Sequence, residues 1–143
     1  MQHINKWVRE NRERPWVTIV AFAIVMATAM MVDAADRKVR NITLLSSGAY
    51  TAATAYSTGF DVSAYIEAQF LVNVTAEAGT STLDITIQTS DDNSTYYDHT
   101  AITQITATGQ YRQAVTNFGK YVRIKYVVGG TSFTFAAVGV FKN

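Results

Sequence analysis

Few side chains in this sequence are suited to acid–base catalysis or metal binding. The chain has two histidines, His3 near its start and His99 beside Tyr97 and Asp98, and it has no cysteine. A catalytic triad or a zinc site needs a histidine held close to further ligands or proton carriers. Because the sequence gives His99 no such partner, we interpret it as a polar loop residue, and we predict no catalytic residue, no metal site and no cofactor.

Oxygen-bearing side chains gather in one short segment that contains Asp91, Asp92, Asn93 and Asp98. Such side chains are the ligands that Ca²⁺ prefers. Their spacing, however, matches neither an EF-hand loop nor a calcium-binding nonapeptide repeat. Asp and Asn also hydrogen-bond to their own backbone in turns. We therefore predict a solvated hairpin loop at residues 90–95.

The sequence also lacks the spacing of known catalytic motifs. Glu67 and Asp84 fall on outward positions of predicted strands, where they would face solvent and not each other across a cleft. There is no glycine-rich phosphate loop, nucleophile elbow or metalloprotease motif. We therefore predict that the chain is not an enzyme.

Tyrosine offers the strongest indication of a binding surface, with eight in 143 residues. Exposed tyrosine combines apolar area with a polar tip, which suits protein interfaces and stacking on sugars. Tyrosine is also common on ordinary sheet faces, so both interpretations stay open. The candidate interface or ligand residues are Trp7, Tyr96, Tyr97, His99, Tyr121 and Arg123.

Charge argues against a nucleic-acid partner. Lys120, Arg123 and Lys125 lie close to Tyr121 and form a modest basic and aromatic segment, but the net charge is only +1. A nucleic-acid-binding domain usually carries a strong positive field. We therefore expect no nucleic acid among the partners.

From residue 41 onward, apolar and polar residues alternate with a period of two, the pattern of half-buried strands. We predict a strand at 66–76 that forms a hairpin with a strand at 83–88, and a second hairpin turn at 129–132. Residues 42–45 predict a first short strand that ends in a turn at 46–48, and residues 49–58 an edge strand or a loop. The predicted core positions are Ile66, Ala68, Phe70, Val72, Val74, Leu83, Ile85, Ile87, Val122, Ile124, Tyr126, Val128, Phe133, Phe135, Ala137 and Phe141.

An uncharged apolar segment at residues 16–32 precedes these strands, with charged residues on both sides. Seventeen residues of α-helix span about 25 Å, slightly less than a hydrocarbon core. The segment therefore fits a membrane span, a helix buried in a protein assembly, or a cleaved signal peptide. Its membrane or assembly residues are Trp16, Val17, Ile19, Val20, Phe22, Ile24, Val25, Met26, Met30 and Met31.

Together these patterns predict a mainly β chain with one N-terminal helix. We expect a charged segment at 1–15, the apolar helix at 16–35, a linker at 36–40 and a β domain at 41–143. Seven or eight short strands without helical pattern favour an antiparallel β-sandwich or jelly roll.

One stretch of the β domain resembles small β-sandwich modules of tailed-phage virion and head-associated proteins. It spans residues 82–135, and its motifs are LDITIQTS, DDNSTYYD, ITATG, TNFGKYVRIKY and GGTSFTF. The resemblance implies a structural or surface-decoration role in a virion, without an active site. The YVRI pattern is also similar to discoidin-like carbohydrate-binding sandwiches.

We therefore expect a non-enzymatic structural subunit of a virion-like or surface array. Its partners would be copies of itself, other structural proteins and a membrane, with the β domain on the exterior side if the helix spans a bilayer. The alternative is a membrane-tethered module that recognises glycans or a partner protein through Tyr96, Tyr97 and nearby loops.

Overall fold

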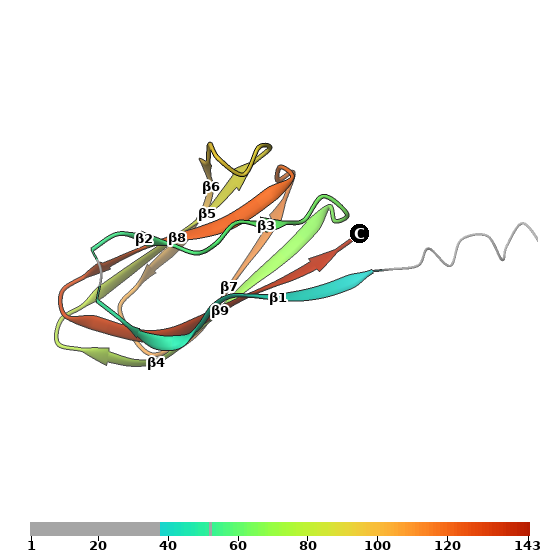
Figure 1. Cartoon of the computed structure of the whole chain (residues 1–143). Coiled ribbons are helices and arrows are strands. Elements are labelled where there is room, and N and C mark those ends of the chain that lie inside the picture. The colour runs from blue at the N-terminus through green and yellow to red at the C-terminus, as the bar shows by residue number, and fades with distance from the viewer. Residues whose placement is uncertain (1–37, 52) are drawn as a thin grey trace, which may run out of the picture. The chain divides into compact units, whose positions relative to one another are not determined.

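The computed structural model describes residues 38–51 and 53–143, which contain nine strands arranged in two antiparallel sheets (Figure 1). The first sheet has the order β1-β9-β4-β7, and the second has the order β2-β8-β5-β6, with β3 also paired to β8. The strands are β1 (Val39–Tyr50), β2 (Ala55–Tyr56), β3 (Phe60–Asp61), β4 (Glu67–Ala78), β5 (Thr82–Ser90), β6 (Tyr97–Ile105), β7 (Gly109–Thr116), β8 (Tyr121–Gly129) and β9 (Ser132–Lys142).

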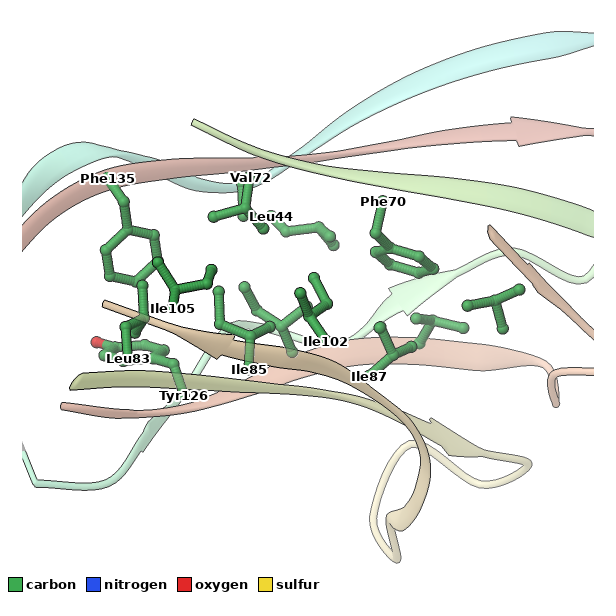
Figure 2. Packing of buried hydrophobic residues seen from close by; sticks show 14 of the residues in the cluster. Leu44, Phe70, Val72, Leu83, Ile85, Ile87, Ile102, Ile105, Tyr126 and Phe135 are labelled. Atoms are coloured by element: carbon green, nitrogen blue, oxygen red, sulfur yellow. The ribbon is translucent and has the colours of Figure 1, made fainter. Parts of the chain in front are cut away.

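The predicted antiparallel β-sandwich is confirmed, because apolar side chains from both sheets meet between them (Figure 2). One sheet contributes Phe70, Val72 and Phe135, and the other contributes Leu83, Ile85 and Ile87, all buried. Alternation explains this layer, since every second side chain of a strand points to the same face. The strand number is higher than predicted because β2 and β3 have only two residues each, too short to leave a pattern.

All but one of the predicted core positions are buried. The exception is Ile66, which is 68% exposed. It precedes β4 and donates its backbone N–H to the Lys142 carbonyl (2.9 Å), so it lies at the end of the sheet, outside the alternating part of the strand.

Both predicted hairpins are wrong. β4 and β5 lie in opposite sheets, and so do β8 and β9. The turns at 79–81 and 130–131 therefore carry the chain across the sandwich. Gly79 and Gly130 have φ values of +68° and +95°, which suits glycine. Among the described strands, only β5 and β6 are consecutive and hydrogen-bonded to each other, so the loop at 91–96 does close a hairpin.

The first strand is also longer than predicted. β1 continues through residues 46–48 to Tyr50, and its pairing with β9 shifts register between Leu45 and Gly48. The Ser-Ser-Gly segment thus forms an irregularity within a strand instead of a turn. The strand ends with Tyr50 packed edge-on against the buried Tyr126, with ring centroids 5.2 Å apart. Burial raises the pKa of Tyr126.

The apolar segment at 16–32, its membrane or assembly residues and Trp7 lie outside the described residues. Within the residues that the structure does describe, no helix is long and apolar enough to cross a membrane.

Candidate functional site

The outer side of the β8-β5-β6 sheet carries a connected polar network, which we call the charged face. At its centre Arg123 donates from Nε to Gln88 Oε1 (2.7 Å), and Gln88 Nε2 donates to Asp98 Oδ1 (2.6 Å). Lys125 Nζ lies 3.3 Å from the other Asp98 oxygen. These side chains meet because Gln88 is paired with Arg123 on β8 and with Asp98 on β6. Hydrogen bonding from Gln88 and the nearby Lys125 lower the pKa of Asp98.

Two tyrosine rings lie against the Arg123 guanidinium. Its Cζ atom is 3.8 Å from the centroid of Tyr96 and 4.4 Å from that of Tyr56. Tyr96 also donates to Asn93 Oδ1, and burial raises its pKa. Gly59 leaves room for this arrangement, since a Cβ there would collide with the Tyr96 hydroxyl oxygen. The arrangement joins the β5–β6 loop to the segment between β2 and β3.

The candidate residues proposed from sequence therefore lie in different parts of the domain. Tyr96 and Arg123 meet on the charged face, whereas the neighbouring Tyr97 lines a pocket between loops. His99 connects two segments: its Nδ1 is 2.7 Å from Thr100 Oγ1, and its Nε2 is 3.3 Å from the Asn117 carbonyl oxygen. The ring of Tyr121 lies 5.3 Å from Lys120 Nζ.

Sequence reasoning missed Tyr56, Gln88 and Asp98 as members of the charged face. Gln88 is buried, with 6% exposure, although it lies on the outward side of β5. Its outward position in the alternation was visible in the sequence. Its partners were not, because they come from strands 10 and 35 residues away.

The pocket between loops, which we call the loop pocket, has a volume of about 310 Å³. It is open to solvent and lies between the β5–β6 hairpin and the β7–β8 turn. Its lining residues are Thr89, Ser90, Asp91, Tyr97, Asn117, Phe118 and Gly119.

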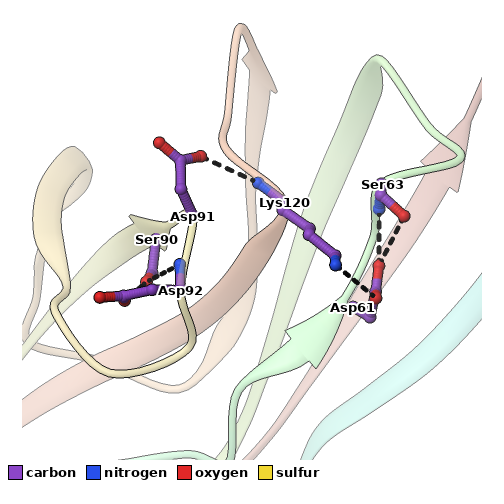
Figure 3. A network of polar contacts seen from close by, with 6 residues as sticks. All are labelled: Asp61, Ser63, Ser90, Asp91, Asp92 and Lys120. Atoms are coloured by element: carbon purple, nitrogen blue, oxygen red, sulfur yellow. Dashed lines mark hydrogen bonds and ion pairs between the residues drawn. The ribbon is translucent and has the colours of Figure 1, made fainter.

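Hydrogen bonds fix the loops beside this pocket (Figure 3). Asp92 Oδ1 accepts the backbone N–H groups of Ser94 and Thr95, both at 2.8 Å, and these bonds lower the pKa of Asp92 to about 2. Lys120 donates its backbone N–H to Asp91 (3.4 Å), and its Nζ lies 4.0 Å from Asp61. Hydrogen bonds from Ser63 lower the pKa of Asp61.

The outer side of the β1-β9-β4-β7 sheet has a different composition. Its central positions hold small, apolar or amide side chains, which we call the neutral face: Gln69, Leu71, Asn73, Ala114, Ala136, Val138 and Val140. Leu71 pairs with Val138 on one side and with Arg112 on the other. Charge appears only at the margin, at Arg112 and at the Glu67–Lys142 pair. Val39, 55% exposed, lies beside Lys142.

Within the described residues, no three His, Asp or Glu side chains converge to hold a metal ion. The described buried side-chain nitrogen and oxygen atoms all have hydrogen-bond partners. The candidate sites are therefore the two contrasting faces and the loop pocket.

No protein-family model matches the chain, and no curated protein matches it. Its fold is similar to that of the PBSX exported protein XepA (18% identity, TM-score 0.57, covering 71% of this chain and 36% of XepA). It is also similar to the SPBc2 prophage-derived protein YomS (11%, 0.54, 78% and 99%) and to a chain in the structure of infectious bursal disease virus, Gx strain (13%, 0.56, 74% and 33%). The chain thus spans about a third of XepA and of the viral chain, and nearly all of YomS. At these identities, the likeness establishes the sandwich fold.

Proposed function

We propose that this chain is a non-enzymatic structural subunit of a virion-like or surface array. Residues 16–35 embed it in a membrane or a protein assembly, and the neutral face makes lateral contacts with a second copy of the chain. If residues 16–35 span a bilayer, the β domain lies on the exterior side.

The neutral face is the observation that carries this proposal. Val140, Gln69 and Ala114 form one row across three strands, and Val138, Leu71 and Arg112 form the next. Apolar side chains at the centre of such a surface are favourable to bury, at about 25 cal/mol per Å². A contact here needs little desolvation of charge, because charged side chains lie only at the margin.

Charge complementarity favours a second copy as the occupant. Glu67 lies in the row on one side of the Val140 row, and Arg112 lies in the row on the other side. A two-fold axis that runs along the Val140 row, between the two facing sheets, exchanges the rows on its two sides. It would therefore place Glu67 of each copy near Arg112 of the other. Two-fold contacts of this kind use one patch twice and are the commonest symmetry of protein oligomers.

Two further observations support the proposal. The fold is shared with the prophage-derived YomS over nearly its whole length and with a chain of a virus. The described domain also begins at Lys38, beside the exposed Val39 and near Ile66, whose N–H binds the Lys142 carbonyl. Exposed apolar side chains near the connection to residues 16–35 are suited to burial in an assembly.

Cysteine cross-linking of the full chain tests the contact. Because the natural sequence has no cysteine, each variant carries a single thiol. We expect Val140→Cys to form disulfide-linked dimers under mild oxidation, since a residue near a two-fold axis approaches its own copy to within disulfide range. The matched control is Thr86→Cys, a half-buried position on the charged face. Equal cross-linking of both variants, or of neither, would contradict the proposal.

A further inference from the structure

We propose that the loop pocket binds a neutral sugar ring. This site goes beyond the assembly role, because the pocket is lined by neither the neutral face nor the Arg123 network. Its volume of about 310 Å³ lies at the lower end of the range for small-molecule sites, which suits one monosaccharide unit.

Two aromatic side chains, Tyr97 and Phe118, line the pocket. Tyr97 is 67% exposed although it lines the pocket, and Phe118 lies half-buried beside it. Tyr97 is among the most exposed large apolar side chains of the described residues. A sugar ring presents apolar C–H groups on its flat faces, and these pack well against an exposed aromatic ring.

Polar side chains line the same pocket. Asp91 and Asn117 both line it and are both exposed. A carboxylate accepts hydrogen bonds from two hydroxyl groups, and an amide both donates and accepts. Neighbouring hydroxyl groups at the edge of a sugar ring match this combination, which would be poorly matched by a purely apolar ligand.

The loops that form the pocket are held together by hydrogen bonds. Gly119 donates its backbone N–H to Thr89 Oγ1, and His99 contacts the Asn117 carbonyl. A Cβ at Gly119 would lie 2.6 Å from Asp91 Oδ1, so glycine allows the turn to approach Asp91 closely. Ordered loops reduce the entropy that binding has to offset, which matters for a small ligand.

Charge then selects the class of sugar. Among the described residues that line the pocket, Asp91 is the one charged side chain, and the neighbouring Lys120 donates its backbone N–H to it. Lys120 Nζ faces Asp61, at 4.0 Å. Because the Asp91 carboxylate repels an anionic ligand, we expect the pocket to favour neutral hexosides over uronic or sialic acids.

Saturation-transfer difference NMR on the full chain tests this site. The protein is held in lauryldimethylamine oxide, since detergents with sugar headgroups would compete. The probes are the methyl glycosides of glucose, galactose, mannose and N-acetylglucosamine, with methyl glucuronide as the acidic comparison. We expect transfer to the ring C–H protons of at least one neutral glycoside, at millimolar concentration.

Two variants and one control identify the pocket. Tyr97→Ala should weaken binding about tenfold and Asp91→Asn about threefold, because each removes one recognition element. Ile66→Ala removes an equally exposed apolar side chain that does not line the pocket, so it should bind like the unmodified chain. Circular dichroism checks that each variant is folded.

Three results would overturn the inference: no transfer from any neutral glycoside, unchanged transfer with folded Tyr97→Ala, or stronger transfer to methyl glucuronide than to the neutral compounds. The cross-linking result at Val140 does not bear on any of them. The sugar site and the assembly contact can therefore fail separately.

Discussion

On the charged face, side chains find their partners within the same molecule, whereas the neutral face presents small apolar side chains outward. Arg123, Gln88 and Asp98 are hydrogen-bonded to one another, and two tyrosine rings cover the guanidinium. Leu71 and Val138 lie half-buried side by side on the opposite surface.

This difference indicates a division of roles between the two sheets. A surface whose polar groups already bind one another contributes mainly to the stability of its own domain. A flat surface with little charge can instead be buried against another molecule at a small desolvation cost. Substitutions on the charged face should therefore change stability, and substitutions on the neutral face should change association.

The largest effect is expected from Val140→Glu on the neutral face. Across a two-fold contact this substitution places two carboxylates opposite each other, and like charges in an interface cost several kcal/mol. The dissociation constant should rise by at least about 100-fold, measured by sedimentation of the full chain in detergent. Thr86→Glu on the charged face is the control. An equal loss of association in both variants would remove the distinction between the faces.

The next effect is on stability, from Arg123→Ala on the charged face. The substitution leaves the buried Gln88 oxygen without its donor and removes two cation–π contacts. These losses should together lower the free energy of unfolding by about 2–4 kcal/mol, measured by urea denaturation.

Lys125→Ala is the matched control for the Arg123 substitution. Lys125 pairs with Asp98 at a half-exposed position, and such surface pairs contribute only about 0–1 kcal/mol. If the two variants lost the same stability, the charged face would not be organised around Arg123.

Gly59→Ala should have a smaller effect, about 1–2 kcal/mol, because a new Cβ would collide with the Tyr96 hydroxyl and with Asn93 Oδ1. The ring of Tyr96 must then move away from Arg123. Gly48→Ala is the control, since its Cβ would make only ordinary contacts, 3.6 Å from Tyr50. Combining Gly59→Ala with Tyr96→Ala should recover part of the lost stability. Additive losses would show that the effect of Gly59→Ala does not come from its collision with Tyr96.

How much of this could be predicted from sequence depends on the kind of information required. Alternation placed Phe133, Phe135 and Phe141 in the core, because period two decides which side of a strand faces inward. It carries no information about which sheet a strand joins. The glycine-rich turn at 129–132 was therefore predicted to close a hairpin, although β8 and β9 lie in different sheets.

The same limit applies to the site. Tyr96 and Arg123 were both proposed from residue type, but their contact depends on β5 lying between β6 and β8. Tyr96 and Tyr97 looked equivalent in sequence, and the start of β6 turns one toward Arg123 and the other toward the loop pocket. Ile66 was assigned to the core by period alone, which cannot show that β4 begins only at Glu67.

The smallest effect is expected in the pH dependence of stability, and it involves the β5–β6 loop beside the charged face. Hydrogen bonds from Thr95, Ser94 and Ser90 hold the pKa of Asp92 at about 2, below its usual 3.8. A carboxyl whose pKa is lower in the folded than in the unfolded state adds stability above the unfolded pKa. That stability is lost as pH falls through the folded pKa, here between about pH 4 and pH 2.

Asp92→Asn should therefore flatten the dependence of the urea midpoint on pH between 4 and 2, and leave a lower midpoint at pH 6. Asp91→Asn is the control for removing a loop charge, because Asp91 accepts one long backbone hydrogen bond, at 3.4 Å. Val140→Cys on the neutral face, kept reduced, should retain the full acid dependence of the natural chain. An unchanged pH profile in Asp92→Asn would show that other carboxylates govern the response to acid. The pH dependence would then give no support for assigning stability to the charged face and its loop.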